Sequence, residues 1–173
     1  TYQASFAGME PIFDRVAHSV RIDGYRDAWV EHHDAADLVS FRLPPVWVEW
    51  TQHQDALQFA PADSSLALVV EKQPQEGINK LDDLESHVTA LLAAAGQEVA
   101  SLEKLYLPSG SYLRVHVVIE AGVAEQYVFA TYHEEHILIF RFSMQTDKFG
   151  IMARTFEQIM NTVRLRDAGK WKT

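Results

Sequence analysis

The sequence contains no cysteine among its 173 residues. Disulfide bonds, thiolate catalysis and cysteine-ligated zinc sites are therefore excluded, because each needs a cysteine sulfur. The absence leaves the compartment open, since proteins of oxidising spaces and of the cytosol can both lack cysteine. The longest strongly apolar stretches run for about ten residues, against the roughly 20 that a membrane-spanning helix needs. The sequence therefore predicts no transmembrane segment.

Positive charge is also scarce: 15 Lys and Arg face 24 Asp and Glu, which gives a formal net charge of −9. Nucleic acids and anionic membrane surfaces bind clustered basic residues, so neither is expected as a partner. Only the last ten residues reverse the balance, with four Lys or Arg against one Asp. We interpret 166–173 as a basic tail whose Trp171 is a candidate partner contact. The alternative is a solvated chain end.

The local signals of common catalytic sites are missing. The eight Gly are scattered, so no glycine-rich loop exists to hold a phosphate. No Gly-x-Ser-x-Gly elbow marks a serine nucleophile, and Ser109-Gly110-Ser111 is typical of a hairpin turn. The sequence therefore predicts no catalytic residue and a protein that is not an enzyme. An enzyme of an unrecognised type ranks third among the hypotheses.

Apolar residues make up 47% of the chain, enough to build the core of one domain. Residues 81–95 and 147–163 carry apolar side chains at helical spacing, and Gly96 ends the first of these helices. The second helix is expected to bury one face, formed by Phe149, Met152, Phe156, Ile159 and Val163.

Shorter segments with an extended pattern precede and separate these helices: 38–43, 47–52, 57–60, 66–71, 99–107, 111–120, 124–132 and 137–144. The last four are joined by connections too short for a parallel crossover, so they must run antiparallel. The sequence thus predicts an α+β fold in which an antiparallel sheet of about six to eight strands is packed by two long helices. A Rossmann fold or a barrel is excluded.

The first 22 residues resemble the chain's own last helix. A shift of 143 residues (149 − 6) pairs identical residues at five positions: Phe6 with Phe149, Met9 with Met152, Phe13 with Phe156, Val20 with Val163 and Arg21 with Arg164. Residues 1–22 are therefore predicted to hold a helix left from a preceding repeat unit of a tandem protein. The alternative is that two amphipathic helices share a period by chance.

A helix of this kind has to cover its apolar face. Phe13, Val16 and Val20 are accordingly candidate partner contacts, or contacts with this domain or with the lost first unit. The chain starts at Thr1 without a signal peptide, and we expect that a leader, such as a lipid-anchoring one, precedes it.

Two further candidate contacts are tryptophans. Trp29 lies in the connector 23–37, which is too aromatic for a free linker. Trp50 lies three residues after Trp47 on one strand, so the two rings should point to opposite faces, one into the core and one partly exposed.

The eight His suggest a metal hypothesis. His32, His33 and Asp34 form an acidic histidine cluster with Asp37, and His133 and His136 flank two Glu at a predicted turn. If the two clusters met in space, they would suit zinc or manganese. The alternatives are a solvated polar turn and a solvated cluster. Neither histidine cluster has the helical spacing of the His-Glu-x-x-His motif. We therefore expect no cofactor.

With this order of elements, the chain resembles the Mog1/PsbP-like α/β/α sandwich group, including its bacterial lipoproteins. The resemblance covers 38–165. It is carried by the start VSFRLPPVWVEW, the helix 81–95, the strands of 99–144 and the last helix with its Val-Arg-Leu end. It implies a non-catalytic accessory protein, as plant members are at photosystem II and eukaryotic members at a small GTPase. No binding residue can be transferred from these relatives.

The first hypothesis for function is thus an extracytoplasmic accessory subunit, periplasmic or at the cell surface and lipid-anchored. It would dock on a larger membrane-bound protein complex. The alternative is a carrier of a small molecule or a metal ion.

Overall fold

The computed structural model describes residues 28–34, 36–53, 56–61, 66–78, 80–119 and 122–166, with the backbone alone for 50–53 and 66. The predicted helix in 1–22, with Phe13, Val16 and Val20, lies outside these residues, as do Trp171 and the side chain of Trp50. The division of the chain at 22, 37 and 165 therefore stays a prediction.

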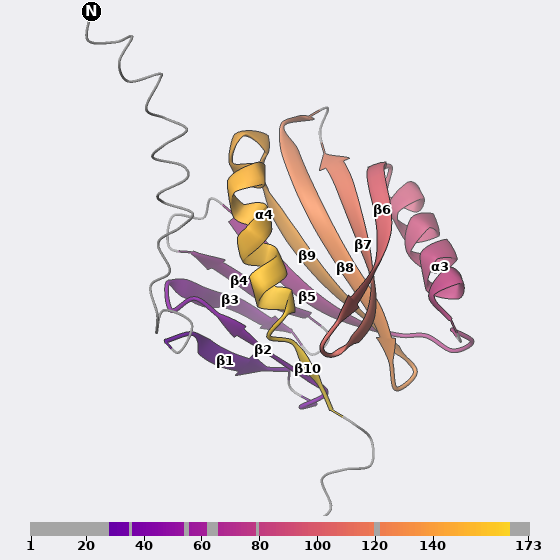
Figure 1. Ribbon diagram of the computed structural model, residues 1–173, viewed down its shortest axis with the longest axis horizontal. Coiled ribbons are helices and arrows are strands. Elements are labelled where there is room, and N and C mark those ends of the chain that lie inside the picture. Colours follow the sequence, from indigo (N-terminus) through magenta and orange to yellow (C-terminus); the bar gives the residue numbers. More distant parts are fainter. Residues whose placement is uncertain are drawn as a thin grey trace, which may run out of the picture.

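The described chain builds a large and a small sheet, both antiparallel (Figure 1). The large sheet has the order β3-β4-β5-β9-β8-β7-β6. Its strands are β3 (Trp47–His53), β4 (Ala56–Pro61), β5 (Leu66–Pro74), β6 (Glu98–Leu107), β7 (Gly110–Ile119), β8 (Ala124–His133) and β9 (His136–Gln145). The small sheet has the order β1-β2-β10, with β1 (Val30–His33), β2 (Val39–Leu43) and β10 (Arg164–Leu165). The α+β architecture with one principal antiparallel sheet is confirmed.

Tight turns fix the register of the large sheet. Glu134 and Glu135 join β8 to β9 with φ angles of 48° and 61°, the left-handed values that a two-residue hairpin turn requires. As a result His133 lies opposite His136, and each later pair along the two strands follows from that register. Between β6 and β7, Gly110 has φ of 141°, which a residue with a Cβ rarely adopts.

Helix α3 (Leu81–Ala94) covers one face of the large sheet over β6, β7 and β8. Its buried residues Leu84, Val88 and Leu92 are spaced by four, so they form one stripe on the helix. The stripe packs in one cluster with buried residues of the strands: Leu113, Val115, Val117, Val128, Ala130, Ile137 and Ile139. This core contains mainly aliphatic side chains.

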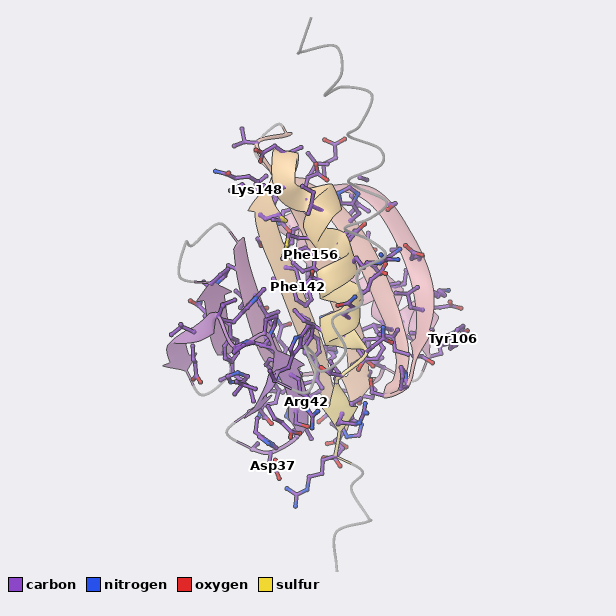
Figure 2. All side chains as sticks on the ribbon, turned by 60° about the vertical axis from the view of Figure 1, so that its left-hand side comes forward. Asp37, Arg42, Tyr106, Phe142, Lys148 and Phe156 are labelled. Carbon is purple, nitrogen blue, oxygen red and sulfur yellow. The ribbon has the colours of Figure 1, made fainter. Side chains whose placement is uncertain are left out.

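Helix α4 (Thr146–Met160) and the small sheet together cover the opposite face (Figure 1). Phe156 is fully buried and stacks on Phe142 of β9, with ring centroids 4.6 Å apart; Figure 2 labels both rings under the helix. Phe41 of β2 meets Phe140 edge to face at 6.0 Å. The predicted inward face is confirmed, because Phe149 and Ile159 are also buried and Met152 is partly buried; the helix ends at Met160, and the buried Val163 follows it.

Two details differ from the expectation. The connector 23–37 contains a strand, β1, whose residues are mostly exposed and therefore lack the alternation by which a strand is recognised. In β3 the register shifts between Glu49 and Thr51, so a bulge interrupts the strict alternation that was used to place Trp47 and Trp50 on opposite faces. Trp47 is 6% exposed and belongs to the core.

Candidate partner-binding surface

Two exposed valines flank the turn between β2 and β3. Pro44 and Pro45 end β2 because proline cannot donate to a sheet ladder. The backbone N–H of Trp47 then closes the turn on the carbonyl oxygen of Pro44 at 3.0 Å. Val46 and Val48, on either side of the buried Trp47, are each 60% exposed.

Val30 extends this group from the small sheet. It is 47% exposed and lies opposite Leu43, the last residue before the turn. We call Val30, Val46 and Val48 the valine patch. Single exposed valines are common, whereas a contact surface needs several apolar side chains close together. The hydrogen bond from Trp47 to Pro44 and the burial of Trp47 anchor the turn that carries Val46 and Val48.

Trp29, predicted to contact a partner, is placed in the core next to the valine patch. It is 6% exposed, and its indole N–H is buried without a hydrogen-bond partner among the described residues. The ring therefore serves the packing of the small sheet and offers almost no surface to another protein.

The two predicted metal clusters lie near one another, but most of their side chains contact cations or backbone groups. Asp34 accepts hydrogen bonds from the backbone N–H groups of Leu38 and Val39, the second at 2.9 Å, and its other oxygen lies 3.6 Å from Lys72 Nζ. Asp34 thus acts as a structural acceptor that fixes the start of β2.

Arg166 bridges the rest of the two clusters. Its guanidinium lies 3.7 Å from Asp37, whose other oxygen is 3.0 Å from Nδ1 of His33. The carbonyl oxygen of Arg166 accepts a 2.6 Å hydrogen bond from Nε2 of His133. Nδ1 of His136 donates to the carbonyl oxygen of Glu134, also at 2.6 Å.

These contacts use the imidazoles and carboxylates for ion pairs and for holding loop backbone. Among the residues that the structure describes, no group of three or more His, Asp or Glu is placed to hold a metal ion. Binding of zinc or manganese, or of a small molecule, therefore stays a prediction from the sequence.

His32 of the first cluster is partly buried between aromatic rings. Its ring lies 4.7 Å from Phe59 and 6.1 Å from Phe41, and Nε2 is buried without a described partner. Burial lowers the pKa of His32, Glu49 opposes the shift, and His33 adds to it. His32 therefore packs between the two sheets in surroundings that disfavour its charged form.

A partly buried ion cluster joins α4 to β6 and β7. Arg114 donates from Nε to Glu103 at 2.7 Å and from another nitrogen to Glu157 of α4, and its guanidinium lies 5.1 Å from the ring centre of Tyr127. Burial alone would lower the pKa of Arg114, but the hydrogen bonds to the two Glu outweigh it and raise the pKa. The guanidinium of Arg114 thus binds both carboxylates.

His116, two residues further along β7, belongs to the same layer. Its ring stacks on Phe149 of α4 at 5.0 Å and 11°, and Nε2 lies 2.7 Å from Glu125. His116 is therefore a partly buried, hydrogen-bonded residue. The layer fastens α4 to the sheet, and its groups serve that contact.

In the described part of the chain, no helix is long and apolar enough to cross a membrane.

No protein-family model matches the chain, and no curated protein matches it in sequence. Its architecture, a large antiparallel sheet with α3 on one face and with α4 and the small sheet on the other, is the Mog1/PsbP-like fold.

Three solved structures share this arrangement. Cyanobacterial PsbP (CyanoP) from a Synechocystis species is 14% identical and superimposes with a TM-score of 0.64 over 86% of this chain and 98% of that one. The Ran-binding protein Mog1p of Saccharomyces cerevisiae is 9% identical, with a TM-score of 0.56 over 80% of this chain and 96% of that one. A Pseudomonas aeruginosa protein described as a putative regulator is 11% identical, with a TM-score of 0.57 over 81% and 99%. At identities this low, the superpositions show a shared fold alone.

Proposed function

We propose that the chain is a non-catalytic accessory domain that binds a larger protein assembly, with the valine patch as the contact. The observation that carries the proposal is the exposure of Val46 and Val48 beside the hydrogen-bonded turn and of Val30 on the strand that pairs with the end of β2. Burying them on a partner would remove apolar surface from water at about 25 cal/mol per Å². A rigid surface also loses little conformational entropy on binding.

The charges of the described site agree with a binding role. The Glu103 and Glu157 carboxylates are held by Arg114, and Asp34 is held by backbone N–H groups and Lys72. These carboxylates are engaged in structural contacts that join strands and helices of the domain. The Ran-binding role in the name of Mog1p, which has the same fold, is a further support.

We further propose that the assembly is membrane-bound and that the domain is extracytoplasmic, periplasmic or at the cell surface, on a lipid anchor. The support for this location is the resemblance to the Mog1/PsbP-like group. The formal charge of −9 disfavours direct binding to an anionic lipid surface, so the proposal attaches the domain through a covalent anchor. Protease added to intact cells or to spheroplasts of the source organism should digest the protein. Protection from protease until the inner membrane is broken would contradict this location.

Site-specific photo-crosslinking tests the valine patch. A photoreactive residue in place of Val46 should give one recurrent adduct in source cells, and the adduct should weaken when Val48→Glu is added. The matched control replaces Ile151, which is 78% exposed on the outer face of α4. An equal adduct from position 151, or an adduct with the mass of two copies of this chain, would overturn the proposal.

A further inference from the structure

The outer strand β6 carries a second surface, at the opposite edge of the large sheet from the valine patch. It is ten residues long and mostly exposed. Within the described ranges no strand pairs with its outer side, although β7 pairs with its inner side along nearly the whole length. Tyr106 near its end is 80% exposed, and Figure 2 shows the ring projecting from the sheet. The outer edge of β6 therefore presents backbone groups that an added strand can use.

On the α3 side of β6, one Lys and two carboxylates form a group with one negative charge in excess, and Lys80 at the start of α3 also acts on Asp82. Lys104 of β6 binds two carboxylates of α3, Asp82 and Glu85, the second at 3.2 Å. The hydrogen bond to Lys104 lowers the pKa of Asp82, and both carboxylates raise the pKa of Lys104. This group, the α3-side triad, thus consists of three charged side chains with a net charge of −1.

The α4 side also carries one basic side chain between two carboxylates. Arg114 of β7 binds Glu103 of β6 and Glu157 of α4. The two carboxylates are about half exposed, so they remain accessible to a further cation beyond the edge. These three residues form the α4-side triad, also with a net charge of −1.

The two triads lie on opposite faces of the sheet at adjacent positions of the outer strand. Glu103 and Lys104 are neighbours in β6, and successive side chains of a strand point to opposite faces. A strand added next to β6 would lie about 4.8 Å away and would also direct successive side chains to the two faces. Two adjacent basic residues in such a strand would reach one triad each.

We propose that β6 binds an extended basic segment of a partner protein as an added strand, with adjacent Lys or Arg residues neutralising the two triads and Tyr106 packing on its side chains. This goes beyond the proposed role of the valine patch, because it uses the other edge of the sheet and a different chemistry. A second copy of this chain is a poor occupant. It would bring a second β6 with the same excess of negative charge, and like charges placed opposite one another destabilise a strand pair.

The irregular start of β6 limits where the segment can bind. The register with β7 shifts between Val99 and Ser101, and a bulge of this kind disturbs a continuous edge. The added strand is therefore confined to the regular part, from Ser101 to Leu107. That part contains both triad residues of β6 and Tyr106.

The experiment uses a short synthetic peptide of Thr and Val with two adjacent Lys at its centre, and a control peptide with two Glu in their place. NMR titration of the whole chain should shift the backbone amide signals of 101–107, and hydrogen exchange of the outward amides should slow. The affinity should fall as salt is raised. Equal binding of the Glu peptide, or shifts that map to β3, would overturn the proposal.

Paired variants give a second readout. Asp82→Asn combined with Glu157→Gln removes one charge from each triad at exposed positions, and it should weaken binding of the Lys peptide by about threefold to tenfold. Glu49→Gln, at an exposed position of the other outer strand, is the control and should leave the affinity unchanged. Failure of the double variant to weaken binding would contradict the β6 site, whereas the crosslink at Val46 tests the valine patch independently.

Discussion

The imidazole of His32 meets the ring of Phe59 edge-on at 4.7 Å, at an angle of 67°, where the small sheet packs on the large one. The contact joins β1, which the sequence did not reveal as a strand, to the core strand β4. It places a titratable group within an apolar contact between two layers.

Acidification should therefore loosen the small sheet. Burial lowers the pKa of His32 below its ordinary 6.5, so in acid the unfolded chain binds a proton that the folded chain does not. The His32 contribution to stability is fully present above about pH 6.5 and is lost as the pH falls through the lower folded value. Urea unfolding should show this loss, and His32→Phe should remove it. An NMR titration midpoint of His32 at or above 6.5 would contradict this.

Tyr112 should give the opposite effect in alkali. Its hydroxyl is buried and lies 2.8 Å from Ser109 Oγ; burial raises the pKa of Tyr112 to about 12, although the Ser109 hydrogen bond opposes the shift. An acid with a raised pKa stabilises the fold below its unfolded value of 10.0, and this contribution is lost as the pH rises through about 12.

Tyr112→Phe should therefore flatten the decrease in stability above pH 10. The measurement is ultraviolet titration of tyrosinate together with unfolding at each pH. Ionisation of every tyrosine near pH 10 in the folded protein would contradict the prediction.

Loss of the Phe156 ring should strongly destabilise the domain. The ring is fully buried between α4 and β9 and stacks on Phe142 at 4.6 Å. Phe156→Ala removes that contact and leaves a cavity, at a cost of about 3–5 kcal/mol in the free energy of unfolding. Phe156→Leu, which fills part of the space, should cost less. Equilibrium urea unfolding measures both, and a loss below about 1 kcal/mol for the Ala variant would show that α4 packs differently.

Arg114→Lys should not be a silent change. The guanidinium donates to two carboxylates and lies over Tyr127, whereas an ammonium is a point charge that cannot reproduce this planar arrangement. Because Glu103 and Glu157 are about half exposed, solvent reduces the expected loss to about 1–2 kcal/mol. Glu157→Gln should cost less, since Arg114 keeps Glu103. Equal stability of Arg114→Lys and the unchanged protein would show that the cluster contributes little.

The sequence was informative where local pattern decides the structure. Both helices follow from apolar residues at spacings of three and four, and the turn at Glu134 and Glu135 follows from the short gap between two apolar strands. β1 could not be recognised because its residues are mostly exposed and its stability comes from pairing with β2.

The candidate surfaces depended on contacts between distant residues. Arg114 and Glu157 are 43 positions apart, so their pairing could not be read from spacing. Trp29 was predicted to contact a partner because it lies in an aromatic-rich connector without clear periodicity, yet the small sheet places it in the core. The exposure of Val46 and Val48 likewise depends on the fold. Alternate residues of an extended segment point to opposite sides, and the core lies on the side of Trp47.

The pairing of β10 with β2 determines when the small sheet can be completed during synthesis. Arg164 and Leu165 pair with Ser40 and Val39, and Arg166 donates its backbone N–H to the carbonyl oxygen of Leu38. The third strand of the small sheet is therefore made last, after the strands and helices of the rest of the domain. Until those residues leave the ribosome, the outer side of β2 stays unpaired, so the small sheet is completed only after the whole domain has been synthesised.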